Sequence, residues 1–196
     1  VSSMLGATEL GYYVVSVSVA EILISLQAAV TTPFISIRYG LDKEDAAHVT
    51  PTAVRHAVFF NSILALGVVA GGNLLILILF GKAFLPAYSA VLFLLPGVIA
   101  LSVHDMVKFE YYSHNLPEFV SMAAVWSLIC NIALNFLLIP TYGINGAALS
   151  SSISYSLATI ILLSRFHATT GISYKEILVI KQSELISIAK KLKLMA

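Results

Sequence analysis

The sequence predicts an all-α fold, a polytopic transmembrane helical bundle with about five spans. Of the 196 residues, 59% are hydrophobic and 11% are charged, and the mean hydropathy is +0.93. A soluble domain has about 45–50% apolar and about 25% charged residues. The apolar residues form continuous runs without the alternation of barrel strands. Because a helix satisfies its own backbone in hydrocarbon, we expect the runs to be helices.

The first three spans are separated from one another by charged residues. They cover 10–33, 57–80 and 87–107. Glu21 is the one charged residue of the first span, and the second contains no Asp, Glu, Lys or Arg. Each run is close to the ~20 residues that a helix needs to cross the hydrocarbon core. We therefore expect three transmembrane helices in this part of the chain.

The last two spans are expected to form a helical hairpin. No charged residue occurs in 119–164, a run that is too long for one ordinary span. Pro140 cannot continue a helix, and Gly143 tolerates dihedral angles that other residues avoid. The run therefore divides at a tight turn into two spans, 119–139 and 146–164.

Lysine and arginine are distributed unevenly between the two ends of these spans. Ten of the eleven lie on the side that carries 34–56, 104–118 and the segment from Arg165 onward, and Lys82 lies on the other side. The ten are Arg38, Lys43, Arg55, Lys108, Arg165, Lys175, Lys181, Lys190, Lys191 and Lys193. By the positive-inside rule, the N-terminus faces outward and the C-terminus faces the cytoplasm. Residues 1–166 form the bundle, and residues 167–196 form a basic amphipathic tail in the cytoplasm, either an interfacial helix or a partly ordered, solvated segment.

Charge and cysteine content argue against several function classes. The formal net charge of +1 gives no basic field, so we expect no nucleic-acid partner. Cys130 is the single cysteine, so it forms neither an intramolecular disulfide nor a Cys-rich zinc site. His104 and Asp105 place a base beside an acid, but no third metal ligand and no activated nucleophile accompanies them. We therefore expect no enzyme, no catalytic residue, no metal and no cofactor.

The most specific motif is the hairpin between Asn131 and Ser151, which contains Leu-Ile-Pro-Thr-Tyr-Gly-Ile-Asn-Gly-Ala-Ala. Shorter motifs precede it in the order Gly11-Tyr12-Tyr13, Leu79-Phe80-Gly81-Lys82-Ala83-Phe84 and Leu95-Pro96-Gly97. Over nearly all of residues 1–175, the chain resembles the second half of polysaccharide-exporter and O-antigen flippase proteins. These proteins are members of the multidrug/oligosaccharidyl-lipid/polysaccharide transporter superfamily.

The resemblance implies that the chain is the C-terminal lobe of a two-lobed transporter. Such a transporter moves a lipid-linked oligosaccharide, a polysaccharide or O-antigen precursor, across the inner (cytoplasmic) membrane by alternating access. The implied partners are this substrate, membrane lipids, and an N-terminal lobe or a second chain. Because the sequence opens on Val1 and not on Met, we expect a piece of a longer polypeptide.

Three other interpretations of the sequence stay open. One is a cation-coupled multidrug exporter of the same superfamily, with Glu21 or Asp105 as the coupling carboxylate. Another is a membrane-embedded, lipid-modifying enzyme that uses His104 and Asp105. The third is an inactive or purely structural membrane fragment.

Charged residues supply five candidates for the substrate pathway. A carboxylate in the middle of a span is costly, so Glu21 either meets water, a cation or sugar, or is a paired structural residue. Arg38, Arg55 and Lys108 lie at the cytoplasmic edge, where a lipid diphosphate would first be captured. Asp105 precedes Lys108 by three residues, so the two share a helix face and are expected to pair.

Amides and small residues complete the candidate set. Asn131 and Asn135 lie one turn apart, so they either hold helices together or contact substrate. Small residues let helix backbones approach closely. This predicts close packing at Gly67, Gly71, Gly146, Ala147 and Ser150. The pair Pro96-Gly97 predicts a kink or a hinge in the third span.

Overall fold

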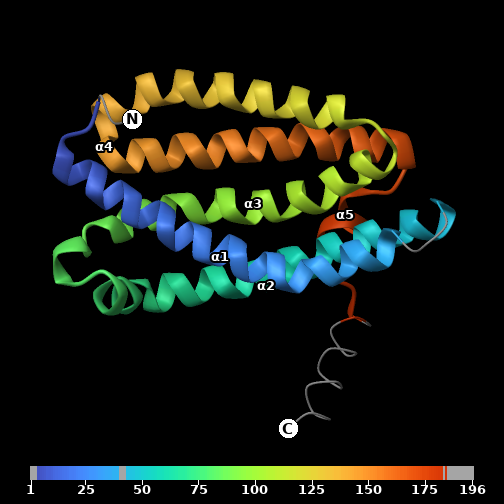
Figure 1. Ribbon diagram of the computed structural model, residues 1–196, viewed down its shortest axis with the longest axis horizontal. Helices are drawn as coiled ribbons and strands as arrows, with labels where there is room; N and C mark the ends of the chain where they lie inside the picture. Colours follow the sequence, from blue (N-terminus) through green and yellow to red (C-terminus); the bar gives the residue numbers. More distant parts are fainter. Residues whose placement is uncertain (1–3, 40–42, 183, 185–196) are drawn as a thin grey trace, which may run out of the picture.

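The computed structural model describes residues 4–39, 43–182 and 184, without the side chains of 30, 31, 33–39 and 43–48. The described chain is helical and contains no strand. Its elements are α1 (Ala7–Tyr39), α2 (Lys43–Leu79), the short 3₁₀ helix η1 (Lys82–Phe84), α3 (Ala87–Ser113), α4 (Pro117–Thr170) and α5 (Tyr174–Leu178). Figure 1 shows α3 in the middle of the bundle, with α4 on one side and with α1 and α2 on the other. The prediction of an all-α polytopic bundle is confirmed.

Within the described residues, four helices are long and apolar enough to cross a membrane: α1, α2, α3 and α4. The helices extend beyond the predicted spans because charged residues at the membrane edge are still good helix formers. The first helix covers 7–39 in place of 10–33, and the second begins at 43 in place of 57. Apolar runs therefore locate the part of each helix that fits hydrocarbon, and not the end of the helix.

The fourth helix, α4, has 54 residues and is folded back on itself at Gly143. Gly143 has φ 53° and ψ −130°, which are not helical angles, and the chain is helical immediately before and after it. The two arms, 117–142 and 144–170, lie against each other in Figure 1. The predicted hairpin is therefore present, but its turn is one residue and not the whole of 140–145, because Gly143 alone supplies the left-handed backbone.

Close contact between α3 and α4 is built at Gly97 and Ser152. The Gly97 amide donates a hydrogen bond to Ser152 Oγ at 3.0 Å, and this hydroxyl donates to the carbonyl oxygen of Phe93. The Ser152 side chain therefore interrupts the backbone hydrogen bonds of α3 next to Pro96. Proline and an inserted side chain are both recognised causes of helix kinks. A Cβ on Gly97 would lie 2.6 Å from Ser152 Cα, so the site has no room for a larger residue.

The small residues of α4 that were predicted to pack closely are buried, whereas the two glycines of α2 are not in close contact with the other described helices. Ala147 and Ser150 are fully buried, and a Cβ on Gly146 would lie 2.3 Å from the carbonyl oxygen of Leu138. In contrast, a Cβ on Gly67 or Gly71 would meet nothing within 4 Å. The predicted packing of these two glycines has no counterpart among the described helices, because they face away from the bundle.

The tail begins differently from the sequence-based expectation. Helix α4 continues through 167 to Thr170, beyond the predicted boundary, and α5 then packs against α2. Ile177 of α5 is fully buried in a cluster with Val54 of α2. Burial of an isoleucine is worth about 1.5–3 kcal/mol in water, so contacts with protein hold this part of the tail against α2. The rest of the predicted amphipathic helix, 185–196, lies outside the described residues.

Candidate functional site

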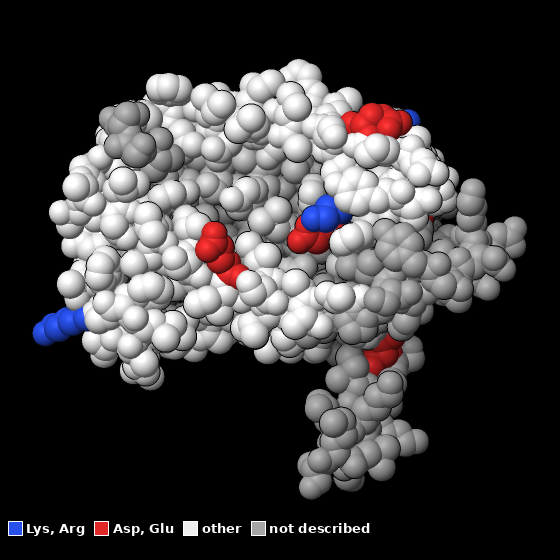
Figure 2. Space-filling model, in the orientation of Figure 1, with Lys and Arg blue, Asp and Glu red and all other residues white. Residues whose placement is uncertain are grey.

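A polar groove lies between α1, α3 and both arms of α4. It has a volume of about 430 Å³. It is lined by Tyr13, Leu101, His104, Ala124, Ser127, Leu128, Asn131, Ser151, Ser154, Tyr155 and Ala158. Figure 2 shows a mostly uncharged face of the molecule that is hollowed along its middle, with an acidic and a basic group side by side in the hollow. The bundle therefore contains a concave, hydrogen-bonding surface between apolar helices.

Short side chains of α4 form much of the groove. Ser127 of the first arm donates a hydrogen bond at 2.7 Å to the carbonyl oxygen of Ser154 in the second arm. Ser151 donates to the carbonyl oxygen of Ala147 at 3.0 Å, and its oxygen lies 3.2 Å from the hydroxyl of Tyr13. Because these side chains are short, they leave the groove open between the two arms of α4. Their hydroxyl oxygens keep lone pairs that can accept further hydrogen bonds.

The two predicted asparagines are brought together, and one of them lines the groove. Asn135 Nδ2 donates a hydrogen bond at 2.8 Å to Asn131 Oδ1. Asn131 lines the groove, whereas Asn135 lies one turn away from it. The bond orients the Asn131 amide, which leaves its NH₂ group as a donor on the groove side.

A charged pair follows His104, one of the residues that line the groove. Lys108 Nζ lies 2.6 Å from Asp105 Oδ1, so the pairing predicted from their spacing is confirmed. His104, which lines the groove, has Nδ1 at 3.7 Å from the same carboxylate oxygen. Asp105 and Lys108 therefore balance each other's charge next to His104.

Glu21 of α1 lies beside the groove and not in the packed core. Its side chain is exposed, and it interacts electrostatically with Tyr155, which lines the groove. Gln27, further along α1, pairs with Asn61 of α2, whose Nδ2 donates a hydrogen bond to Gln27 Oε1 at 2.9 Å. An exposed carboxylate at this depth of a membrane bundle needs water or a polar partner.

Arg55 is held inside the protein and does not line the groove. Only 5% of it is exposed. Its guanidinium donates hydrogen bonds to both carboxylate oxygens of Glu184, to the carbonyl oxygen of Glu176 and to Thr52. These bonds from Arg55 hold the pKa of Glu184 below its ordinary value. The side chain of Arg38, the other predicted edge arginine, lies outside the described residues.

Most of the groove residues are absent from the sequence-based candidate set. Tyr13, Ser127, Ser151 and Tyr155 come from distant positions, and each resembles an ordinary membrane-interface or packing residue when it is considered alone. The signal that could have found them is the density of hydroxyl side chains around 150–156, on the arm that follows Gly143. In the part of the chain that the structure describes, no three His, Cys, Asp or Glu side chains are grouped as a metal site.

Comparison with known proteins gives one informative similarity. No family model and no solved structure matches the chain. The chain is 24% identical over 163 residues to a probable low-salt glycan biosynthesis flippase of Haloferax volcanii. The alignment covers 81% of this chain but 34% of that protein, so the chain spans about a third of the relative's length. This similarity confirms the resemblance to flippases that the hairpin and the shorter motifs indicated.

Proposed function

We propose that this multi-pass membrane chain is the C-terminal lobe of a flippase that moves a lipid-linked oligosaccharide across the cytoplasmic membrane. The observation that carries the proposal is the polar groove, a hydrogen-bonding surface inside an apolar bundle. The similarity to a glycan biosynthesis flippase supports the class of substrate. Because the chain spans about a third of that relative, an N-terminal lobe or a second chain would complete the pathway.

The groove suits a sugar because its lining is rich in neutral hydrogen-bonding groups. A sugar hydroxyl that enters hydrocarbon without a partner costs several kcal/mol, on the order of 4–8 for transfer to cyclohexane. Asn131 can donate and accept, Tyr13 and Tyr155 add phenol groups, and the serines add acceptors. Each of these contacts replaces a contact with water, which lowers the barrier for a glycan to cross the membrane.

The same lining supports transport over bond cleavage. Among the described residues, His104 is the imidazole that lines the groove, and its neighbour Asp105 is already paired with Lys108. The remaining polar groups are hydroxyls and amides, which bind and orient a sugar but supply no general acid and base at catalytic spacing. Glu21, beside Tyr155, is the carboxylate that would meet sugar or a coupling cation at the groove's edge.

In an alternating-access cycle, the groove would form this lobe's half of the transport pathway. Rocking against the completing lobe would expose the groove first to one side of the membrane and then to the other, as in other transporters with two repeats. Contacts between Gly97 and Ser152 would keep α3 and α4 together during this motion, so the movement would occur between lobes.

Groove substitutions test the proposed function. In proteoliposomes that hold the chain, alone or with the polypeptide that completes it, transfer of a fluorescent lipid-linked oligosaccharide between leaflets is measured. Asn131→Leu and Tyr155→Phe each remove one groove hydrogen bond, so we expect about three- to tenfold slower transfer. Glu21→Gln and Glu21→Leu separate the role of charge from that of hydrogen bonding at this position.

Matched controls lie outside the groove on exposed positions of the same bundle. Asn73→Leu and Tyr142→Phe make the same chemical changes there and should transfer the glycan lipid at the rate of the unchanged protein. Equal transfer rates for the groove variants and their controls would contradict a role for the groove in transport.

A further inference from the structure

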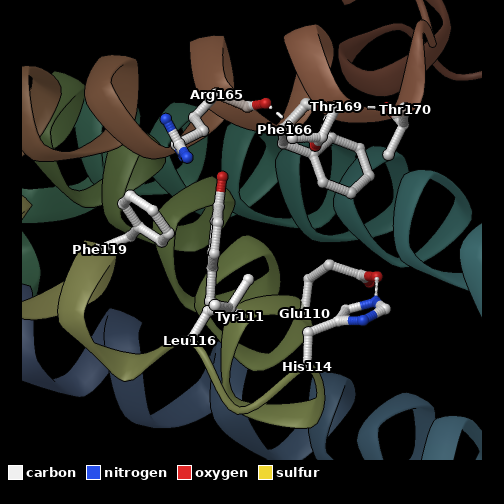
Figure 3. A pocket seen from close by; sticks show the side chains of 9 residues that line it. All are labelled: Glu110, Tyr111, His114, Leu116, Phe119, Arg165, Phe166, Thr169 and Thr170. Atoms are coloured by element: carbon white, nitrogen blue, oxygen red, sulfur yellow. Dashed lines mark hydrogen bonds and ion pairs between the residues drawn. The ribbon is translucent and has the colours of Figure 1, made fainter.

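A second cavity lies where the ends of α3 and α4 meet, away from the polar groove. Its volume is about 290 Å³. It is lined by Glu110, Tyr111, His114, Leu116, Phe119, Arg165, Phe166, Thr169 and Thr170, and is called the end pocket below. Figure 3 shows that Arg165 and Phe119 lie together on one side of this pocket and that Glu110 and His114 lie together on another.

Arg165 is the basic side chain that the pocket offers to a ligand. Its guanidinium carbon lies 3.8 Å from the centre of the Phe119 ring, so the plane is stacked on an aromatic face. Stacking holds the guanidinium in place but leaves the N–H groups at its edge open to bind. Among the described residues, no carboxylate forms an ion pair with Arg165.

The other polar groups of the end pocket already have partners. Glu110 is 6% exposed; one of its carboxylate oxygens lies 2.9 Å from His114 Nε2, and the other accepts a hydrogen bond from Thr50 at 2.6 Å. Tyr111 donates its hydroxyl to the carbonyl oxygen of Leu162 at 3.0 Å. Arg165 therefore supplies the cationic donors of the pocket, and the acidic group is engaged on the opposite side.

The place of the pocket in the fold indicates what an anion there would be attached to. α3 ends at Ser113, α4 begins at Pro117 and the second arm ends at Thr170, so three helix ends surround the pocket. Ends of membrane-spanning helices lie at the level of lipid headgroups. Beside the cation lie the apolar side chains of Leu116, Phe119 and Phe166, which suit the start of an acyl chain.

We propose that the end pocket binds the phosphate of an anionic membrane lipid, with Arg165 forked on the phosphate oxygens and the acyl chain against Phe119 and Leu116. The lipid would join the start of α4 to its end, two segments that are far apart in the sequence. This site is distinct from the groove, and it holds whether or not the chain transports a glycan lipid.

Native mass spectrometry of the purified chain, titrated with phosphatidylglycerol or phosphatidylcholine, tests the site. Both lipids carry a phosphodiester, but the choline cation of phosphatidylcholine offsets its charge and is repelled by Arg165. Weakening a charge-assisted bond in this way is enough to change affinity about tenfold. We therefore expect phosphatidylglycerol to bind about tenfold more tightly than phosphatidylcholine, and Arg165→Gln to remove this preference. Phe119→Leu removes the stack and should weaken binding about threefold.

Lys82→Gln is the matched control, because it removes one positive charge at the opposite end of the bundle. It should bind phosphatidylglycerol as the unchanged protein does. Thermal unfolding of each variant identifies any that is misfolded; if Arg165→Gln does not fold, then Phe119→Leu and Arg165→Lys, which keeps the charge but loses the fork, carry the test.

Three results would overturn the proposal. One is unchanged binding of phosphatidylglycerol by Arg165→Gln, and another is an equal loss in Lys82→Gln. The third is displacement of phosphatidylglycerol by an equal concentration of inorganic phosphate, which would assign the pocket to the free ion and not to a lipid.

Discussion

Arg55 joins the start of α2 to the segment that follows α5. The guanidinium is buried, and Glu184 neutralises it through three hydrogen bonds. A buried charge that loses its partner is strongly destabilising, because the remaining ion is not solvated. At the scale of single residues, this pair therefore decides whether the beginning of the tail stays on the bundle.

Removal of the Glu184 charge should release this segment. We expect Glu184→Gln to lower the free energy of unfolding by about 1–3 kcal/mol and to raise the mobility of a spin label at position 182, in a Cys130→Ala background. Because the pKa of Glu184 is lowered in the folded protein, its contribution is fully present above the ordinary pKa of 4.5 and is lost as pH falls through the lower folded value. Label mobility should thus stay low at neutral pH and rise only in acid.

The control for this substitution is Glu176→Gln. Glu176 gives Arg55 its backbone carbonyl oxygen, but its own carboxylate is 57% exposed and lies 4.0 Å from Lys181. Surface pairs of this kind contribute little, so stability and label mobility should be nearly unchanged. A Glu184→Gln variant that resembles this control would show that the pair does not hold the tail.

Residue contacts were predictable from the sequence where they are local. The pair of Asp105 and Lys108 follows from a spacing of three residues on one helix face. Arg55 and Glu184 are separated by 129 residues, and no periodicity relates them. The sequence therefore placed Arg55 at an open edge, whereas the fold brings a distant carboxylate to it.

At the scale of helices, the packing of α3 against α4, and of the two arms of α4 against each other, depends on small residues at a few positions. Gly97 and Gly146 each face atoms that a Cβ would approach within 2.6 Å or less. In lipid, the hydrophobic effect contributes little to the association of helices. Close van der Waals contact and interhelical hydrogen bonds stabilise it instead. Loss of contact at either glycine would separate helices that line the groove.

Larger side chains at Gly146 and Ser150, two buried positions of the second arm of α4, should disrupt folding, and Gly67 supplies a control. We expect Gly146→Leu and Ser150→Leu to reduce the folded yield in detergent severely, because overpacking of this kind costs about 1–3 kcal/mol or more. Gly67→Leu should be tolerated, since a Cβ there meets open space. Folded yield is measured by size-exclusion chromatography; equal yields for all three would mean that the arm after Gly143 does not pack as described.

The apolar runs were sufficient to predict the existence and order of the helices but not their ends. α2 begins at Lys43 because helical structure propagates through charged residues once it is formed. The hairpin of α4 was predictable from Gly143, whereas Pro140, which was expected to end the span, lies inside the first arm. The bond between Gly97 and Ser152 was not predictable, because it joins two helices at a register that composition does not specify.

At the scale of the whole molecule, the bundle separates two sets of connections. Figure 1 shows the start of α1 and the turn of α4 at one end, and the connection from α3 to α4 and the start of the tail at the other. Lys82 belongs to the first end, whereas Lys108 and Arg165 lie toward the second. This arrangement agrees with the uneven distribution of lysine and arginine along the sequence, and it supports an outward N-terminus.

Cysteine labelling in intact cells tests this orientation. In a Cys130→Ala background, we expect a cysteine at Asn145 to react with an impermeant reagent added outside. A cysteine at Gln182 should react only after the membrane is opened, because it lies at the end that carries most positive charges. Modification of the Asn145 position only from the cytoplasm would reverse the orientation.

The single-residue reversal of α4 also bears on how the chain is inserted during its synthesis. Sorting signals for a membrane segment are read mainly from the lysines and arginines that flank it. No charge of either sign occurs from Phe119 to Ser164, so the ribosome delivers both arms before such a signal follows. No connecting segment separates the two arms at Gly143, so neither arm has flanking charged residues there. We therefore expect the hairpin, and not the individual helix, to be inserted as one unit.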